Sequence, residues 1–198
     1  MKTQKKRMAI HFTGLPHVDK ECATQFRNFV NGLKEEYDIS LFGYFYTGST
    51  TRSFRSKNVD AQLVQNYGSF KDLVVEHDKS PDVLPAATQI GNTELEPMLT
   101  LLVNMTKVKA LHYDKAFDVC IFMQTDTLLV ADMQLPDCGN FITMLSRTDP
   151  ENFSEEEFDS EAFCKMDTRD YLLIGSSDIV ENILSEWSYF FESYALID

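Results

Sequence analysis

One short apolar run in the middle of the chain constrains the possible fold more than any other stretch. Residues 117–123 are Phe-Asp-Val-Cys-Ile-Phe-Met, in which every side chain except the aspartate is apolar. A run this short and this rich in β-branched and aromatic residues is typical of a strand buried on both faces of a sheet. Such strands belong to α/β proteins, because helices cover both faces of the sheet there. The sequence therefore predicts a central strand at this position.

A polar cluster with a single carboxylate, Asp126, follows this run and precedes a second apolar run from Thr127 to Ala131. In an open α/β sheet, ligands bind at the carboxyl ends of the strands. Asp126 is therefore a candidate ligand of a metal ion or of a phosphate-bearing molecule. The alternative interpretation is a turn aspartate that only caps the strand end, since aspartate is common in turns.

Strand-like and helix-like patterns alternate along the chain. Short apolar runs predict strands, and apolar residues repeated every three or four positions predict helices. Asp19 and Asp178 are expected to cap helices, and Met98 and Met105 are expected to fill the core. The predicted strands are residues 8–12, 39–46, 73–76, 117–123, 140–145 and 171–175, and the predicted helices are residues 19–37, 59–67, 93–111 and a last helix from Asp178.

This order of elements predicts an α/β fold. The 198 residues are enough for one substantial core, and no repeat or low-complexity linker divides them. A strand, a turn and a helix within the first 37 residues form the opening of a βαβ unit. We therefore expect a single domain over residues 1–198, with a mostly parallel central sheet flanked by helices.

Charge and cysteine content narrow the class of protein further. The net charge is −13, and residues 149–198 contribute 14 acidic and 2 basic side chains to it. A protein that binds duplex nucleic acid needs a broad basic face, so nucleic acid is not an expected partner. The four cysteines are scattered with no CxxC pair, which indicates reduced thiols in a cytoplasmic protein. No apolar run approaches the roughly 20 residues that cross a bilayer, and no signal-peptide core follows the basic start.

Polar groups that could hold a nucleotide follow the first two predicted strands. Thr13 and Gly14 begin a predicted turn over residues 13–17, and the hydroxyl and backbone N–H groups of such a turn can bind phosphate. His17 lies in the same turn and is a further candidate for a phosphate contact. Arg52 lies in a small, polar, cationic loop after the second strand, which is either a diphosphate contact or a solvated loop.

Two carboxylates complete the candidate site. Asp126 offers the hard oxygen ligands that Mg²⁺ and Mn²⁺ prefer. Asp170 directly precedes the predicted strand at 171–175 and is a candidate general base toward an acceptor hydroxyl. Taken together in an α/β order, these groups predict a nucleotide-dependent site.

Three segments resemble one family in order along most of the chain. They are Ile10-His-Phe-Thr13-Gly14-Leu-Pro16, the stretch from Tyr113 through Phe117 to Asp126 and Leu128, and Arg169-Asp170-Tyr171-Leu-Leu-Ile-Gly175-Ser176. These segments resemble glycosyltransferases of the GT-A type, particularly bacterial and viral enzymes of polysaccharide and lipopolysaccharide synthesis.

The resemblance implies a GT-A-like, Rossmann-like fold and an enzyme that moves a sugar from a nucleotide-sugar donor to a glycan or other hydroxyl acceptor. It also implies a Mn²⁺ or Mg²⁺ ion held by an Asp-x-Asp motif, whose last aspartate corresponds to Asp126. Thr13 and Gly14 would then hold the nucleotide, with His17 and Arg52 as further contacts. Asp170 would be the catalytic base.

The central strand departs from the family pattern at two positions. Gln124 stands where the first aspartate of the motif is expected, and Phe122 and Gln124 stand where similar enzymes have arginines. These departures support a second hypothesis, a catalytically degenerate GT-A-like binding or scaffold protein that docks through its acidic, aromatic last helix. His11 alternates within a buried strand and is expected to be a core imidazole with a hydrogen-bond partner.

Overall fold

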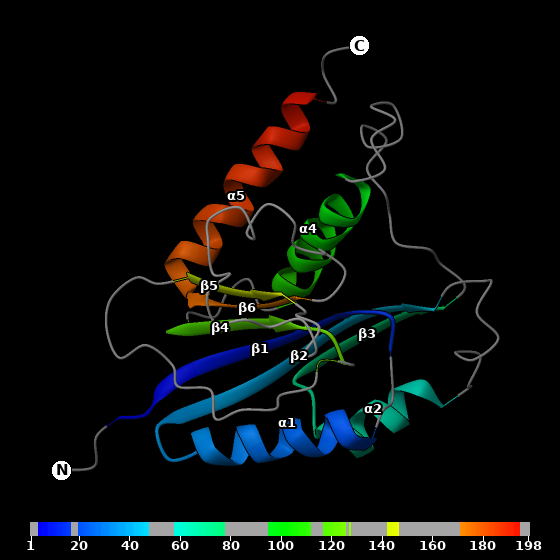
Figure 1. The fold of residues 1–198 in the computed structure, drawn as a ribbon, viewed down its shortest axis with the longest axis vertical. Helices are drawn as coiled ribbons and strands as arrows, with labels where there is room; N and C mark the ends of the chain where they lie inside the picture. The colour runs from blue at the N-terminus through cyan, green and yellow to red at the C-terminus, as the bar shows by residue number, and fades with distance from the viewer. Residues whose placement is uncertain are drawn as a thin grey trace, which may run out of the picture.

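The computed structural model of the chain describes residues 4–16, 20–47, 58–77, 95–111, 117–125, 127, 142–146 and 171–194. These residues form a mixed α/β fold in three layers (Figure 1). Helices α1 and α2 cover one face of the sheet, and helices α4 and α5 cover the other. The α/β fold with a sheet flanked by helices, which the sequence predicts, is confirmed.

The sheet contains six described strands in the order β3-β2-β1-β4-β6-β5. Strands β1 to β4 run parallel to one another, whereas β6 runs antiparallel to both β4 and β5. The prediction of a mostly parallel sheet is therefore confirmed. The strands are β1 (Lys6–Gly14), β2 (Tyr37–Thr47), β3 (Asp72–His77), β4 (Val119–Met123), β5 (Ile142–Ser146) and β6 (Tyr171–Ser176).

The described helices agree with the apolar periodicity of the sequence, although the ends of α1 and α4 and the start of α5 differ from the prediction. They are α1 (Lys20–Leu33), α2 (Val59–Tyr67), α4 (Leu95–Ala110) and α5 (Ser177–Tyr194). Asp178 lies in the first turn of α5, so it does not cap that helix as predicted. The helix begins at Ser177 because β6 runs directly into it, and the Ser177 backbone N–H donates to the Asp118 carbonyl at 3.4 Å. Asp19 lies outside the described residues.

Helix α1 was predicted to continue to Tyr37, and this was wrong. The helix ends at Leu33, and the Glu36 N–H donates to the Leu33 carbonyl at 3.1 Å to close the turn. Tyr37 instead begins β2, where its side chain is buried in the core below the sheet. The apolar side chain of Tyr37 fits the helical period, so the local pattern could not exclude a longer helix.

Side chains of β1 alternate between the two cores. Met8, Ile10 and Phe12 pack with α1 and α2, whereas Ala9 packs with α4 and α5. His11 lies on the Ala9 face, is fully buried, and stacks on Phe122 with 4.2 Å between ring centroids. Its Nδ1–H donates to the Ile121 carbonyl at 3.1 Å. The expected core imidazole is confirmed.

The core under α4 and α5 contains Met105, as predicted, together with Val108, Val180 and Leu184. The side chain of Met98 lies outside the described part of the chain. Within that described part, no helix is long and apolar enough to cross a membrane.

Candidate functional site

The strand order reverses beside β1, and this reversal locates the candidate site. The chain proceeds from β1 outward to β2 and β3 on one side, whereas β4 lies on the other side of β1. The direction of the strand order therefore changes between β1 and β4, whose carboxyl ends lie side by side. Ligands of open α/β sheets bind at this kind of switch point.

Thr13 and Gly14 are the last two residues of β1, at that edge of the sheet. The sequence predicted a turn beginning at Thr13, but strand pairing with β2 continues through Thr13↔Tyr44 and Gly14↔Phe45. Thr13 is 0% exposed, and its Oγ1 has no hydrogen-bond partner among the described residues. A buried hydroxyl without a partner costs free energy, so such groups are rare unless a ligand or water satisfies them.

Gly14 ends β1 with a φ of 103°, a backbone conformation that residues with a side chain rarely adopt. A Cβ built at this position meets no atom within 4 Å among the described residues. The glycine is therefore required by the backbone conformation. It also leaves its surroundings open to a group that approaches the end of β1.

Two residues that the sequence did not single out join the ends of β1 and β4. Thr125 follows β4 and is 1% exposed, and its hydroxyl donates to the Leu15 carbonyl at 3.4 Å. The Tyr67 hydroxyl, at the end of α2, donates to the Thr125 carbonyl. These bonds hold the segments after β1 and β4 beside each other. The position of Thr125, two residues after the predicted central strand, was the available sequence signal.

The reversed direction of β6 brings a third strand end to the same edge. Met123, the last residue of β4, pairs with Leu172 near the start of β6. The amino end of β6 therefore lies beside the carboxyl end of β4. The sequence places Asp170 directly before β6, but Asp170 itself lies outside the described residues.

Of the six predicted site residues, the structure describes Thr13 and Gly14 and brings them to the switch point. His17, Arg52, Asp126 and Asp170 lie outside the described residues, so their predicted roles stay predictions. Gln124, which stands where the resemblance implies an acid, is half-buried just after β4. Within the described ranges there is no group of three or more His, Cys, Asp or Glu side chains that could hold a metal ion.

Helix α4 adds a polar cluster on the Thr13 face of the sheet. Asn104 is 4% exposed and forms a side-chain hydrogen bond with Tyr46 of β2. One turn later, the Lys107 amine lies 5.0 Å from the centre of the Tyr44 ring. Burial raises the pKa of both tyrosine hydroxyls. At Tyr46, the hydrogen bond to Asn104 offsets part of this rise. At Tyr44, Lys107 offsets part of the rise in pKa, whereas Glu76 adds to it.

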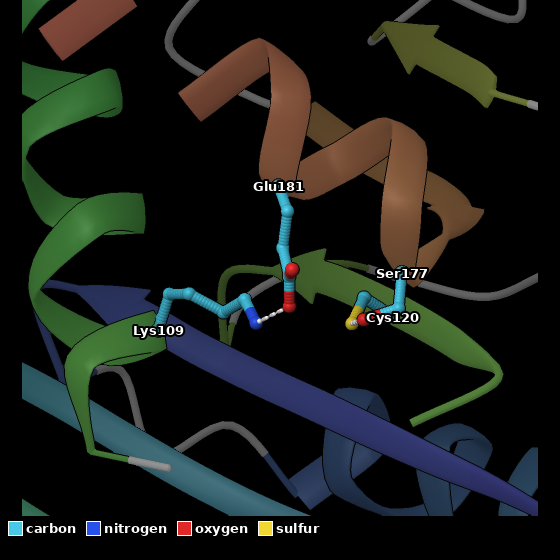
Figure 2. A network of polar contacts seen from close by, with 4 residues as sticks. All are labelled: Lys109, Cys120, Ser177 and Glu181. Atoms are coloured by element: carbon cyan, nitrogen blue, oxygen red, sulfur yellow. Dashed lines mark hydrogen bonds and ion pairs between the residues drawn. The ribbon is translucent and has the colours of Figure 1, made fainter. Parts of the chain in front are cut away.

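A second polar network lies at the opposite edge of the sheet (Figure 2). Lys109 of α4 forms an ion pair with Glu181 of α5 at 2.6 Å. Beside them, the Cys120 thiol donates to the Ser177 hydroxyl at 3.6 Å (Figure 2). Burial raises the pKa of the Cys120 thiol, so the unreactive protonated form dominates at neutral pH. This network joins the helices to the sheet and is structural.

A comparison of the sequence with protein-family models and with curated proteins finds no match. The class that fold and site define together is therefore a mixed α/β protein with a candidate ligand site at the switch point of its sheet.

Proposed function

We propose that this protein is a GT-A-like glycosyltransferase, which moves a sugar from a nucleotide-sugar donor to a glycan or other hydroxyl acceptor. The observation that supports this best is the unpartnered, buried hydroxyl of Thr13 beside the open backbone of Gly14 at the switch point. Hydroxyl and backbone N–H groups at the end of β1 are suited to a nucleotide. The resemblance of residues 10–16 to the opening of GT-A enzymes supports the same assignment.

In the proposed reaction, Thr13 and Gly14 bind the donor nucleotide, and His17 and Arg52 add contacts to its diphosphate. Asp126, assisted by the Gln124 amide oxygen, provides oxygen ligands that suit Mn²⁺ or Mg²⁺, with one negative charge instead of two. When bound, such an ion supplies Lewis-acid stabilisation of the departing diphosphate.

Asp170 is the proposed general base in a reaction that inverts the configuration of the sugar. It would accept the proton of the acceptor hydroxyl as the new glycosidic bond forms. Its place in the sequence directly before β6 supports this role, because the start of β6 lies beside the end of β4. Cys22 and Cys120 are buried as thiols and not as disulfides, which suits a reducing compartment, so we place the reaction in the cytoplasm.

The substitution Thr13→Val tests the proposal, because valine keeps the shape of threonine and removes its hydroxyl. We expect the free energy of unfolding to stay constant or rise by about 1 kcal/mol, since an unpartnered buried polar group is lost. Binding of the preferred donor among UDP-glucose, GDP-mannose and dTDP-glucose, measured by calorimetry with Mn²⁺, should weaken about tenfold.

Ser176→Ala is the matched control. The Ser176 hydroxyl is also buried without a partner among the described residues, but it lies at the end of β6 opposite Val119, at the far edge of the sheet. This variant should show a similar stability change and unchanged donor binding. The proposal fails if the unmodified protein binds none of the three donors.

The degenerate binding protein is a second candidate function, favoured by Gln124 in place of an acid. Such a protein binds the donor and shows no turnover. Assays of donor hydrolysis and of sugar transfer with Mn²⁺ separate the two candidates, since only the enzyme releases nucleotide diphosphate. In the enzyme, Asp126→Ala should lower that release at least a hundredfold, because the metal ligand is removed.

A further inference from the structure

Among the described residues, Thr13 and Asn104 of α4 both have a buried polar atom without a hydrogen-bond partner on the same side of the sheet. Asn104 is 4% exposed, and its Oδ1 has no hydrogen-bond partner among the described residues. Its side-chain amide is nevertheless oriented by a hydrogen bond with the Tyr46 hydroxyl. A carbonyl oxygen can only accept hydrogen bonds, so the missing partner must be an N–H or O–H donor.

The register of the elements places Asn104 close to the candidate site. Lys107 lies over the ring of Tyr44, and Tyr44 is the strand partner of Thr13. Asn104 precedes Lys107 by about one helical turn, roughly 4.5 Å along α4. Its partner Tyr46 lies two residues beyond Tyr44, about 7 Å farther toward the carboxyl end of β2. Asn104 therefore lies above the carboxyl edge of the sheet, on the face where Thr13 lies.

Two unpartnered buried polar groups thus lie on one side of the sheet near one edge. Thr13 offers a hydroxyl, which can donate or accept, and Asn104 offers an acceptor. Each unpartnered group carries a desolvation cost in the ligand-free protein. A binding site whose polar groups are satisfied only by the correct ligand rejects ligands that lack the matching group.

We infer that Asn104 is a specificity-determining residue of the nucleotide-sugar site and accepts a hydrogen bond from an O–H or N–H group of the donor substrate. This inference rests on the proposed function. It adds a residue on α4 to the residues at the end of β1 that bind the donor. The donor group belongs either to the nucleotide or to the transferred sugar, since both contain such groups. Tyr46 is a positioning residue, which holds the Asn104 amide in the orientation that leaves Oδ1 available.

The test compares Asn104→Leu with the unmodified protein. Leucine has a similar size and no polar atom, so the variant should bind the preferred donor among UDP-glucose, GDP-mannose and dTDP-glucose about tenfold more weakly in calorimetry with Mn²⁺. Tyr46→Phe keeps Oδ1 and loses only the positioning bond, so a smaller loss is expected. Asn104→Leu could unfold because Tyr46 loses its partner. In that case the double variant Asn104→Leu/Tyr46→Phe, which removes both polar groups, is used in its place.

A parallel titration with UDP, GDP and dTDP identifies the source of the hydrogen bond. Equal losses for the free diphosphate and its sugar conjugate assign the bond to the nucleotide, whereas a loss confined to the conjugate assigns it to the sugar. Either result supports the inference, provided that Ser176→Ala binds like the unmodified protein.

Unchanged binding by the Asn104 variants, in a protein that does bind a donor, would overturn the inference and leave the proposed function standing. An internal water would then be the partner of Oδ1. If the unmodified protein binds no donor and no diphosphate, the proposed function fails and the inference fails with it.

Discussion

Glycine is required at position 43, in the middle of β2, because neighbouring side chains leave no room for a Cβ. A Cβ built on it lies 2.7 Å from a methyl carbon of Leu73 and 2.8 Å from the ring of Phe45, with the ring of Phe70 at 3.1 Å. Leu73 is its strand partner in β3, so the crowding comes from the pairing of β2 with β3. Glycine weakens a strand in general, yet here it allows large side chains to pack over the backbone.

Gly43→Ala should therefore destabilise the protein by about 1–3 kcal/mol, because the added methyl group overpacks the core. Urea denaturation measures the effect. Gly32→Ala is the matched control: Gly32 lies in the exposed part of α1, and a Cβ there meets nothing within 4 Å among the described residues. This control should stabilise the protein by about 0.5–1 kcal/mol. The same sign for both changes would contradict the crowding argument.

At the residue scale, the sequence identified residues whose role depends on their own strand. His11 was expected in the core and Thr13 and Gly14 at a strand end, because apolar alternation locates both. Tyr67 and Asn104 could not be found in this way. Their partners, Thr125 and Tyr46, are distant in sequence, and only the packing of α2 and α4 on the sheet brings these groups together.

At the scale of elements, an ion pair joins α4 and α5 at the edge opposite the site. The Lys109 side chain is 13% exposed and that of Glu181 is 52% exposed. Solvent screens the more exposed partner, so the pair contributes little despite its short distance. The buried contacts of Val108, Val180 and Leu184 hold the helices far more strongly.

A double-mutant cycle of Lys109→Met and Glu181→Gln should give a coupling of about 0.5 kcal/mol, measured by urea denaturation. The coupling should shrink at high salt, because ions screen the exposed carboxylate. The cycle of Lys109→Met with Glu186→Gln is the control, since Glu186 is an exposed acid elsewhere on α5. A coupling above about 2 kcal/mol would show that the pair behaves as a buried one.

The apolar periodicity of the sequence predicted where the helices and strands lie. It did not predict the strand direction, which depends on how strands pair in the sheet. The predicted bounds of α2 agree with the structure, and each described strand overlaps a predicted one. The end of α1 was misjudged because Tyr37 satisfies the helical period and the strand pattern equally well. The direction of β6 is not encoded in alternation at all, since a run of apolar residues has the same pattern in either direction.

For the whole molecule, three buried groups in the described part of the chain make stability depend on alkaline pH. Burial raises the pKa of the Cys120 thiol above its ordinary value of 9.0 and those of Tyr44 and Tyr46 above 10.0. Between the ordinary and the raised pKa, the folded protein holds protons that the unfolded chain has released. Stability therefore falls as the pH rises through that interval, first for the thiol and then for the tyrosines.

The midpoint of thermal unfolding should consequently decrease above about pH 9, and these three groups should add no slope below about pH 8. Cys120→Ala should flatten the first part of the decrease and leave the part above about pH 10 in place. Scanning calorimetry at closely spaced pH values measures both profiles. Identical profiles for the two proteins would contradict the assignment to Cys120.

The position of β6 has a consequence for how the protein is made. β6 lies between β4 and β5 in the sheet but follows both in the sequence, and it is the described strand with which β5 pairs. During synthesis, β4 thus leaves the ribosome with an open edge beside it, and β5 leaves before the strand that it pairs with. Open strand edges template aggregation. The nascent chain therefore depends on its last described strand and helix to close the sheet, and chaperone protection matters most just before they emerge.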